Sequence, residues 1–243
     1  MITKTEVKYI QSLAHKKFRE EEKVMVAEGI KMVDELLLDF PDQVKKIYAT
    51  AEWFQMGRNM PKGISFSEVE QYELDKLTFL KQSNQVLALV NLPDIKIPSP
   101  TGVLLVLDQI QDPGNLGTII RTCDWFGISG IICSPDTADA YSPKVVQSTM
   151  GSIFRMPVLY TDLVPYLEKM NNMPVFGATI NGESMENIQF SKPCCLVIGN
   201  ESKGISSPVL GAVSKTVSVP RKGRAESLNA AVAAAILLSK ITA

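Results

Sequence analysis

The stretch GVLLVLDQIQDPGNLGTIIRTCDWFG, from Gly102 to Gly127, holds the pattern that decides the fold. Its first six residues form a continuous apolar run that ends at Asp108, which is typical of a strand buried on both faces of a parallel sheet. The turn DPGN follows, and the spacing beyond it predicts a helix over 115–126. A buried strand, a short turn and a helix in this order indicate an α/β fold built on a parallel sheet.

The same alternation continues toward the C-terminus. Strands are predicted over 130–133, 156–159, 175–179, 194–198 and 217–219, and helices over 144–150, 162–170, 208–213 and from near Ser227 to Ile241. The last helix is apolar nearly all round, so it should be buried or form an interface. Repeated units of this kind imply helices on both faces of the sheet, with ligands at the carboxyl ends of the strands.

The N-terminal part shows a different organisation and predicts a small α/β unit with its own core. Helices are expected over 3–19 and 67–80, strands over 44–50 and 85–90, and a strand passing into a helix with Ile30, Val33, Leu37 and Leu38 on its core face. The segment LPDIKIPSP contains three prolines and is typical of a linker. We therefore expect a domain over 1–92, a linker over 93–101 and a second domain over 102–243.

Composition excludes several classes of protein. Lysine and arginine number 25 against 26 acidic residues, so any nucleic-acid contact must come from local clusters. No apolar run is long enough to span a membrane, and the first residues are too charged for a signal peptide. The single histidine, His15, argues against a histidine triad, and the four cysteines lack metal-ligand spacing. The cysteines indicate buried thiols in a reducing, cytoplasmic compartment. We also expect no metal site.

Three loops follow predicted strands of the sheet: DQIQDPGNLG, GNESKGIS and PRKGRAESLN. In the first, Asn115 is placed to cap the helix and Gly117 permits close backbone approach. Each loop alone also fits an ordinary role. The first fits a turn with a surface arginine, the second a loop anchored through Glu201, and the third a solvated basic loop before a capped core helix.

Together the three loops resemble the sequence motifs of the SpoU (TrmH-like) family of RNA ribose 2′-O-methyltransferases, in the SPOUT superfamily. The matching residues are Asn115-Leu116-Gly117-Thr118-Ile119-Ile120-Arg121, then Gly199-Asn200-Glu201 with Gly204, then Val219-Pro220, Gly223 and Ser227-Leu228-Asn229. Arg221 and Ala230-Ala231 depart from the residues usual in the family. More weakly, the N-terminal part is similar to the substrate-binding domain of members that modify ribosomal RNA, through Lys16-Lys17-Phe18-Arg19 and Ala27-Glu28-Gly29.

This resemblance implies a parallel α/β fold whose C-terminal segment is threaded into a trefoil knot. It also implies a homodimer that binds S-adenosylmethionine in the knot loops. By position, the backbone around Gly199, Val219 and Leu228 should touch the cofactor, with Thr179 nearby.

The reaction implied by the resemblance is attack of a ribose 2′-oxygen on the cofactor's methyl group. Because arginine is always protonated and accepts no hydrogen bond, we expect Arg121 to stabilise the developing alkoxide, with Glu201 or an RNA phosphate as proton acceptor. Asn115, Ser227 and Asn229 would orient Arg121 and the ribose. The expected RNA contacts are Lys16, Lys17, Arg19, Arg221, Lys222 and Arg224.

A 2′-hydroxyl substrate means RNA, and the N-terminal part favours ribosomal over transfer RNA. Two other hypotheses stay open at this point. One is a non-catalytic RNA-binding or ribosome-assembly factor that shares the fold. The other is a nucleotide-dependent enzyme of ordinary doubly wound fold, although the chain lacks its glycine fingerprint.

Overall fold

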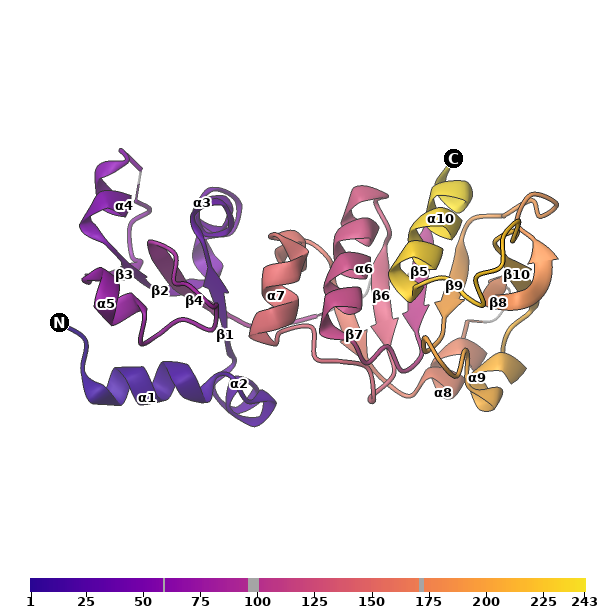
Figure 1. Cartoon of the computed structure of the whole chain (residues 1–243), viewed down its shortest axis with the longest axis horizontal. Coiled ribbons are helices and arrows are strands. Elements are labelled where there is room, and N and C mark those ends of the chain that lie inside the picture. The colour runs from indigo at the N-terminus through magenta and orange to yellow at the C-terminus, as the bar shows by residue number, and fades with distance from the viewer. Residues whose placement is uncertain (59, 96–100, 171–172) are drawn as a thin grey trace. The chain divides into compact units, whose positions relative to one another are not determined.

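The computed structural model describes residues 1–58, 60–95, 101–170 and 173–243, and Figure 1 shows its elements. Contacts divide the chain into two compact units, Met1–Asp94 with Asp139–Phe154, and Ile95–Ala138 with Arg155–Ala243. The segment 139–154 thus packs with the N-terminal residues, although it lies inside the predicted range 102–243. Most of the expected linker, residues 96–100, lies outside the described residues.

The first unit is an α/β unit around a four-stranded sheet of order β1-β4-β2-β3. The β4 strand pairs antiparallel with β1 and β2, and β3 pairs parallel with β2. Its elements are α1 (Lys4–Ser12), α2 (Lys16–Glu22), β1 (Val24–Glu28), α3 (Ile30–Asp39), η1 (Pro41–Gln43), β2 (Val44–Ala49), α4 (Ala51–Gln55), β3 (Ser65–Glu68), α5 (Gln71–Leu74), β4 (Val86–Asn91), α7 (Pro143–Thr149) and η2 (Ser152–Phe154).

Two predictions for this unit are wrong. The helix expected over 67–80 is limited to α5, because Ser65–Glu68 pairs as an edge strand with β2 and a capping box at Glu70 and Glu73 starts the helix late. In α3, Leu38 is 81% exposed, whereas Met32 and Leu36 are buried. The remaining strands and the helix α3 lie where the pattern predicts them.

The expected N-terminal helix over 3–19 is also interrupted, and the interruption buries Arg19. Helix α1 ends at Ser12 and α2 begins at Lys16, so the carbonyl of Leu13 is left to accept a hydrogen bond from the Arg19 guanidinium. The same guanidinium pairs with Asp139, and Arg19 is only 2% exposed. Arg19 therefore serves the interior of this unit, which corrects its expected role as an RNA contact.

The second unit carries a six-stranded sheet of order β10-β8-β9-β5-β6-β7, and every pair in it is parallel. This confirms the predicted α/β class. Its elements are β5 (Val103–Leu107), α6 (Pro113–Trp125), β6 (Gly130–Cys133), β7 (Val158–Tyr160), α8 (Leu163–Glu168), β8 (Val175–Ser184), β9 (Cys194–Ile198), α9 (Ser207–Gly211), β10 (Lys215–Ser218) and α10 (Ala230–Thr242).

Helices cover both faces of this sheet (Figure 1). Residues of α8 and α9 pack with Leu104, Val106 and Val197 on one face. Because side chains alternate along a strand, Leu105 and Leu196 face the opposite side, where α6 and α10 contact each other and the strands β6 and β9. All residues of β5 and β9 are buried, as the continuous apolar runs predicted.

The last helix differs in two respects from its prediction. It begins at Ala230, not near Ser227, and only one side of it is fully buried, through Ala234, Leu237, Leu238 and other residues. The expected trefoil knot stays a prediction.

We predict that removing the partner of buried Arg19 destabilises the protein more than removing the charge itself. Asp139→Ala leaves an unpaired guanidinium in the interior and should lower the free energy of unfolding by about 3 kcal/mol. Arg19→Met keeps the apolar stem and leaves only the more accessible carboxylate, so it should cost less. Urea unfolding measures both, and an equal or reversed order would contradict the assignment.

Candidate active site

The three loops singled out in the sequence meet at the carboxyl edge of the parallel sheet. They follow β5, β9 and β10, and the first two of these strands are neighbours. From β5 the chain continues to β6 and β7 on one side of β5, whereas β9 lies on its other side. The direction in which successive strands are added to the sheet therefore changes between β5 and β9. A crevice at such a position is where open α/β sheets bind their ligands.

Asn115 joins the three loops through its side-chain amide. Its Nδ2 donates to Glu201 Oε1 at 2.6 Å, and its Oδ1 accepts from Asn229 Nδ2 at 2.9 Å. We call this set of three residues the Asn115 hub. It connects one residue from each of the three motifs, which lie up to 114 positions apart in the chain.

The side chain of Asn115 is available for this role because another residue caps its helix. Asp112 is the N-cap of α6, and its Oδ1 accepts from the backbone N–H of Asn115 at 2.8 Å. The expectation that Asn115 itself is the cap is therefore wrong. Proline at position 113 occupies the first turn, where its missing N–H costs nothing.

Asn229 combines a cap with a contact to the hub. Its Oδ1 accepts from the backbone N–H groups of Ala231 at 2.9 Å and Val232 at 3.3 Å, while its Nδ2 points to Asn115. Ser227 lies two residues before this cap in an exposed loop. Its hydroxyl makes no hydrogen bond within the described parts of the chain, so the structure does not join it to the hub.

Arg121 lies farther along α6, about 1.7 turns or roughly 9 Å beyond Asn115 along the helix axis. It is exposed, and within the described residues its guanidinium has no hydrogen-bond or ion-pair partner. It lines a cavity of about 250 Å³ between α6 and α10, together with Thr118, Thr122, Trp125, Phe126 and Ala235. Trp125 is 85% exposed.

The loop after β9 folds tightly on itself next to the hub. The backbones of Asn200 and Gly204 exchange two hydrogen bonds, of 3.0 and 2.9 Å. A Cβ added to Gly199 would lie 2.3 Å from the carbonyl carbon of Gly204, so only glycine fits there. Because no side chain fits at position 199, this position can offer a ligand only backbone groups.

The pairing of β8 with its neighbours is interrupted within the strand. Its register with β10 passes from Gly177 opposite Thr216 to Glu183 opposite Val217, so residues 178–182 lie outside that ladder. Its register with β9 also ends at Gly177. Thr179 belongs to this segment, whose residues have no register partner in either neighbouring strand.

The expected basic RNA contacts have different surroundings. Arg221, Lys222 and Arg224 are exposed in the loop before α10, and Leu228 in the same loop is 46% exposed. Lys16 and Lys17 are also exposed, each with a loose ion pair to a glutamate one turn later, at 3.7 and 3.8 Å. Such pairs are weak and leave both ammonium groups accessible.

The four cysteines are buried, as expected. Burial raises the pKa of each thiol, and that of Cys195 to about 12, so they remain protonated at neutral pH. No group of three or more metal-ligating side chains was found among the described residues. The described helices include none long and apolar enough to cross a membrane.

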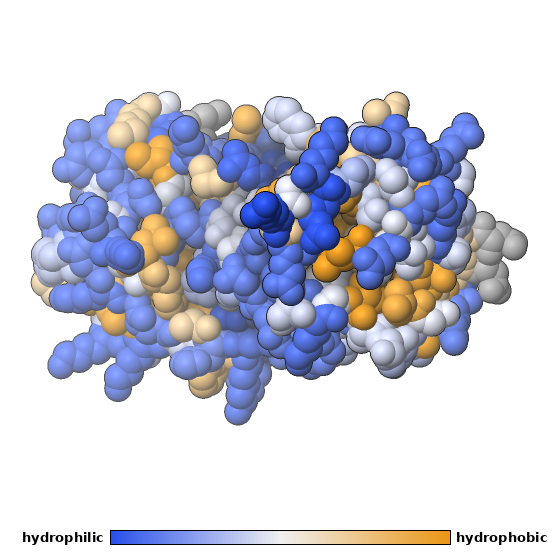
Figure 2. All heavy atoms as spheres, turned by 45° about the vertical axis from the view of Figure 1, so that its right-hand side comes forward, coloured by the Kyte–Doolittle hydropathy of each residue, from blue (hydrophilic) through white to orange (hydrophobic). Residues whose placement is uncertain are grey.

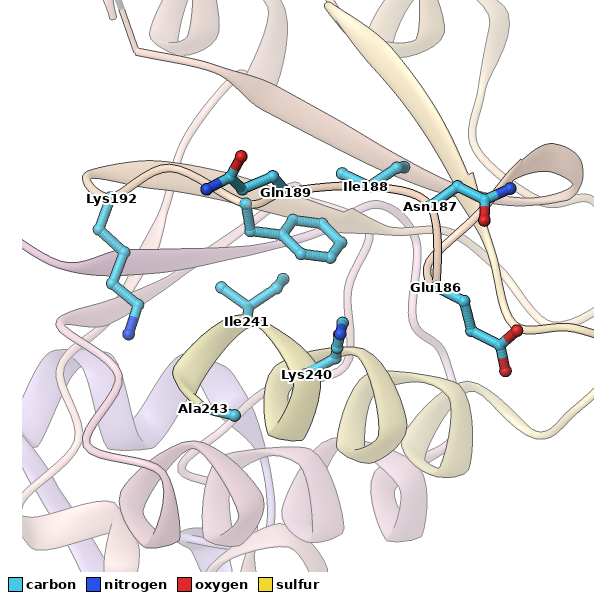
Figure 3. A pocket seen from close by; sticks show the side chains of 9 residues that line it. Glu186, Asn187, Ile188, Gln189, Lys192, Lys240, Ile241 and Ala243 are labelled. Carbon is cyan, nitrogen blue, oxygen red and sulfur yellow. The ribbon is translucent and has the colours of Figure 1, made fainter.

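A second cavity, of about 580 Å³, lies between the segment 186–192 and the C-terminal end of α10 (Figure 3). Glu186, Lys192 and Lys240 project around it. Phe190 also lines it and packs edge-on against Phe176. The hub lies at the other end of α10, about 18 Å away along a helix of 13 residues. This cavity is therefore separate from the candidate active site.

Sequence reasoning missed three residues that organise the site. Asp112 carries a recognisable signal, since an Asp before Pro-Gly is a typical helix start. Gln109 has a left-handed backbone (φ 60°), and Asn200 binds several groups of its own loop. Nothing in the sequence indicates the hydrogen bond that joins these last two residues, because they lie 91 positions apart.

Comparison with known families gives two matches along the chain. The model of the SpoU rRNA Methylase family matches residues 102–239, and that of the MRM3-like substrate binding domain matches residues 4–88. The first match contains all three loops and the whole Asn115 hub.

Similar proteins extend over nearly the whole chain. The 23S rRNA (guanosine(2553)-2′-O)-methyltransferase RlmP of Bacillus subtilis is 34% identical over 235 residues, covering 96% of this chain and 94% of that protein. Among solved structures, a putative RNA methyltransferase of the TrmH family from Porphyromonas gingivalis has a TM-score of 0.91 at 32% identity and covers 99% of this chain and 98% of that one. An AdoMet-bound rRNA methyltransferase from Sinorhizobium meliloti has a TM-score of 0.86 at 29% identity, with coverages of 99% and 95%.

We predict that the two roles of Asn229 can be separated. Asn229→Ala removes the cap of α10 and should lower the free energy of unfolding by about 1 kcal/mol. Asn229→Asp keeps the accepting oxygen, so it should preserve most of that stability while losing the donor to Asn115. Urea unfolding of both variants checks this, and equal losses would show that the cap contributes little.

Proposed function

This chain belongs to the SpoU rRNA Methylase family, and from that membership we propose that it methylates a ribose 2′-hydroxyl of ribosomal RNA with S-adenosylmethionine. The observation that carries this proposal is the Asn115 hub, which brings residues of all three motifs together at the ligand-binding edge of the sheet. The substrate class is supported by the printed activity of RlmP and by the match to a substrate-binding domain.

The loops at this edge suit the cofactor. Gly199 offers only backbone, residues 178–182 with Thr179 lie outside the β8 ladders, and Val219 and Leu228 add partly exposed apolar surface. Backbone groups beside apolar side chains match an adenosine moiety, which needs hydrogen-bond partners at its edge and apolar contact at its faces. We assign Thr179, Gly199, Val219 and Leu228 to cofactor binding.

Bound S-adenosylmethionine supplies a methyl group that its sulfonium sulfur already activates. The residues of the chain therefore have to orient the ribose and help remove the proton of its 2′-hydroxyl. Glu201 has one oxygen bound to Asn115 and a second oxygen to accept that proton. Arg121 stabilises the negative charge that develops on the 2′-oxygen. Asn115 and Asn229 orient Glu201 through the hub, and Ser227 helps orient the ribose.

The RNA is held by exposed cations of both parts of the chain. We assign the phosphate contacts to Lys16 and Lys17, and to Arg221, Lys222 and Arg224 in the loop before α10. We retain a substrate-binding domain over 1–92, a linker over 93–101 and a methyltransferase domain over 102–243. The buried thiols and a ribosomal RNA substrate support action in the cytoplasm.

Two alternatives are less well supported. A non-catalytic RNA-binding or ribosome-assembly factor has no use for a bound carboxylate beside the proposed ribose site, yet Glu201 is held there by Asn115. A transfer RNA substrate is disfavoured because RlmP, which aligns with 96% of this chain, is named for 23S rRNA.

We also propose that the protein forms a homodimer through α6 and α10, the C-terminal segment being knotted as in its family. Trp125 on α6 is 85% exposed and Val232 on α10 is 48% exposed, and the two helices contact each other. Figure 2 shows hydrophobic side chains gathered on the half of the molecule that carries the second unit. Two copies related by a twofold axis would cover this surface with itself.

We predict that Arg121 acts in methyl transfer and not in cofactor binding. Arg121→Ala should reduce methyl transfer to ribosomal RNA by about a thousandfold, as for loss of a group that stabilises an oxyanion, with S-adenosylmethionine binding retained. Calorimetry measures binding, and transfer of a labelled methyl group measures activity. The fold is checked by circular dichroism.

Two further variants serve as controls for Arg121→Ala. Lys222→Ala should instead weaken RNA binding and reduce the slope of its salt dependence by about one, with little change in kcat. Lys169→Ala, an exposed cation after α8, should behave as wild type. Absence of S-adenosylmethionine binding in the natively folded wild-type protein would refute the enzyme proposal.

We predict that Trp125 contributes to self-association. Trp125→Glu should weaken self-association by roughly thirtyfold or more, because a buried interface tryptophan commonly contributes at least about 2 kcal/mol. Sedimentation equilibrium measures the change. The matched control is Leu210→Glu, an exposed apolar position on α9, which should leave the dimer intact. A wild-type monomer, or equal effects of both variants, would contradict the proposed surface.

A further inference from the structure

We propose that Asn200 is a positioning residue for the reaction, which sets Glu201 by tying the loop after β9 to the end of β5. The inference rests on the proposed function, and it adds a residue to which neither motif matching nor the hub assigns a role. Its basis is the set of hydrogen bonds that the Asn200 side chain makes in two directions.

Toward its own loop, Asn200 acts as an acceptor. Its Oδ1 accepts from the backbone N–H of Ser202 at 3.0 Å, from the Ser202 hydroxyl at 2.9 Å and from the backbone N–H of Lys203 at 3.1 Å. The backbone of Asn200 adds two hydrogen bonds with Gly204. These contacts close the residues 200–204 into a compact turn in which Glu201 is the second residue.

Toward the neighbouring loop, Asn200 acts as a donor. Its Nδ2 donates to the backbone carbonyl of Gln109 at 2.9 Å, across 91 positions of sequence. This bond is a side-chain link from the compact turn to the loop that leads into α6. Asn200 is the residue next to Glu201. The Glu201 carboxylate accepts a hydrogen bond from Asn115, which belongs to the same loop as Gln109.

The carbonyl of Gln109 is held in place to receive this bond. Gln109 has a left-handed backbone (φ 60°), which is unfavourable for a residue with a side chain and persists only where its surroundings enforce it. Its N–H donates to Ser134 Oγ at 2.9 Å, and Ser134 Oγ is 3.0 Å from Thr137 Oγ1. Ser134 and Thr137 are buried, so the backbone of Gln109 is anchored to the interior next to the carbonyl that accepts from Asn200.

A second link closes the far end of the same loop. The buried carboxylate of Asp108, beside Gln109, accepts from the backbone N–H of Ser206 at 2.7 Å. The loop is thus fixed at Ser206 by Asp108 and at Asn200 by Gln109, with Glu201 near the second point. Loss of the Asn200 link frees the end that carries Glu201 and leaves the other end in place.

This geometry makes Asn200→Asp a selective probe. Aspartate has nearly the same shape and still accepts from Ser202 and Lys203, but it replaces the donor with an oxygen that faces the Gln109 carbonyl. We expect kcat to fall by about tenfold to a hundredfold, the range for an unmade hydrogen bond to a held partner. The KM for RNA should change less than about twofold, because no RNA contact is altered.

Two controls separate this link from charge and from general loosening. Asn187→Asp adds the same charge at an exposed position in the segment 186–192 and should leave activity unchanged. Ser202→Ala removes one bond to Asn200 but keeps the link to Gln109, so it should reduce kcat by less than about threefold.

A double-mutant cycle tests whether Asn200 acts through Glu201. In a Glu201→Gln background, Asn200→Asp should reduce kcat by less than about twofold, because the group that it positions is already impaired. A full additional loss in that background would overturn the positioning role, as would wild-type kcat in the single variant.

Hydrogen exchange gives a readout that needs no turnover. Backbone amides of residues 199–206 should exchange about tenfold faster in Asn200→Asp than in Asn187→Asp, whereas α10 should be unaffected. Equal exchange would overturn the inference even in an active enzyme. If the wild-type protein lacks S-adenosylmethionine binding, the proposed function fails by itself, and the exchange result still decides whether Asn200 holds the loop.

Discussion

The architecture of the site depends on the two hydrogen bonds of the Asn115 side chain. A carboxamide both donates and accepts, so one residue can bind the Glu201 carboxylate on one side and the Asn229 amide on the other. An aspartate at this position could accept from Asn229 but could not donate to Glu201. A leucine could do neither. Through this residue, three loops from separate strands acquire one common geometry.

Much of the second unit followed from periodicity. Continuous apolar runs predicted the central strands β5 and β9, because strands buried on both faces need apolar residues throughout. The failures lie where long-range pairing or capping overrides local preference. The edge strand at 65–68 replaced a predicted helix, and Asp112 took the cap expected of Asn115.

The site was predictable as a set of residues but less so as a set of contacts. The motif residues Asn115, Glu201 and Asn229 were expected to act together, and the structure joins them. The link from Asn200 to Gln109 and the burial of Arg19 were not foreseen, since each depends on a carbonyl that a local backbone turn exposes. Every residue has a backbone carbonyl, so the residue types in the sequence do not indicate which carbonyl is left to accept a side-chain hydrogen bond.

The segment 178–182 has a consequence for how this protein can change over evolutionary time. Residues 178–181 lie outside the ladder between β8 and β10, whereas Gly182 packs against the backbone of Val217. The pairing of Glu183 with Val217 therefore does not depend on how many residues precede Gly182. A residue gained or lost there would leave the facing side chains beyond it in register, unlike a slip inside a continuous strand. This part of the site can therefore vary in length, and with it the shape offered to a ligand, while the surrounding sheet stays the same.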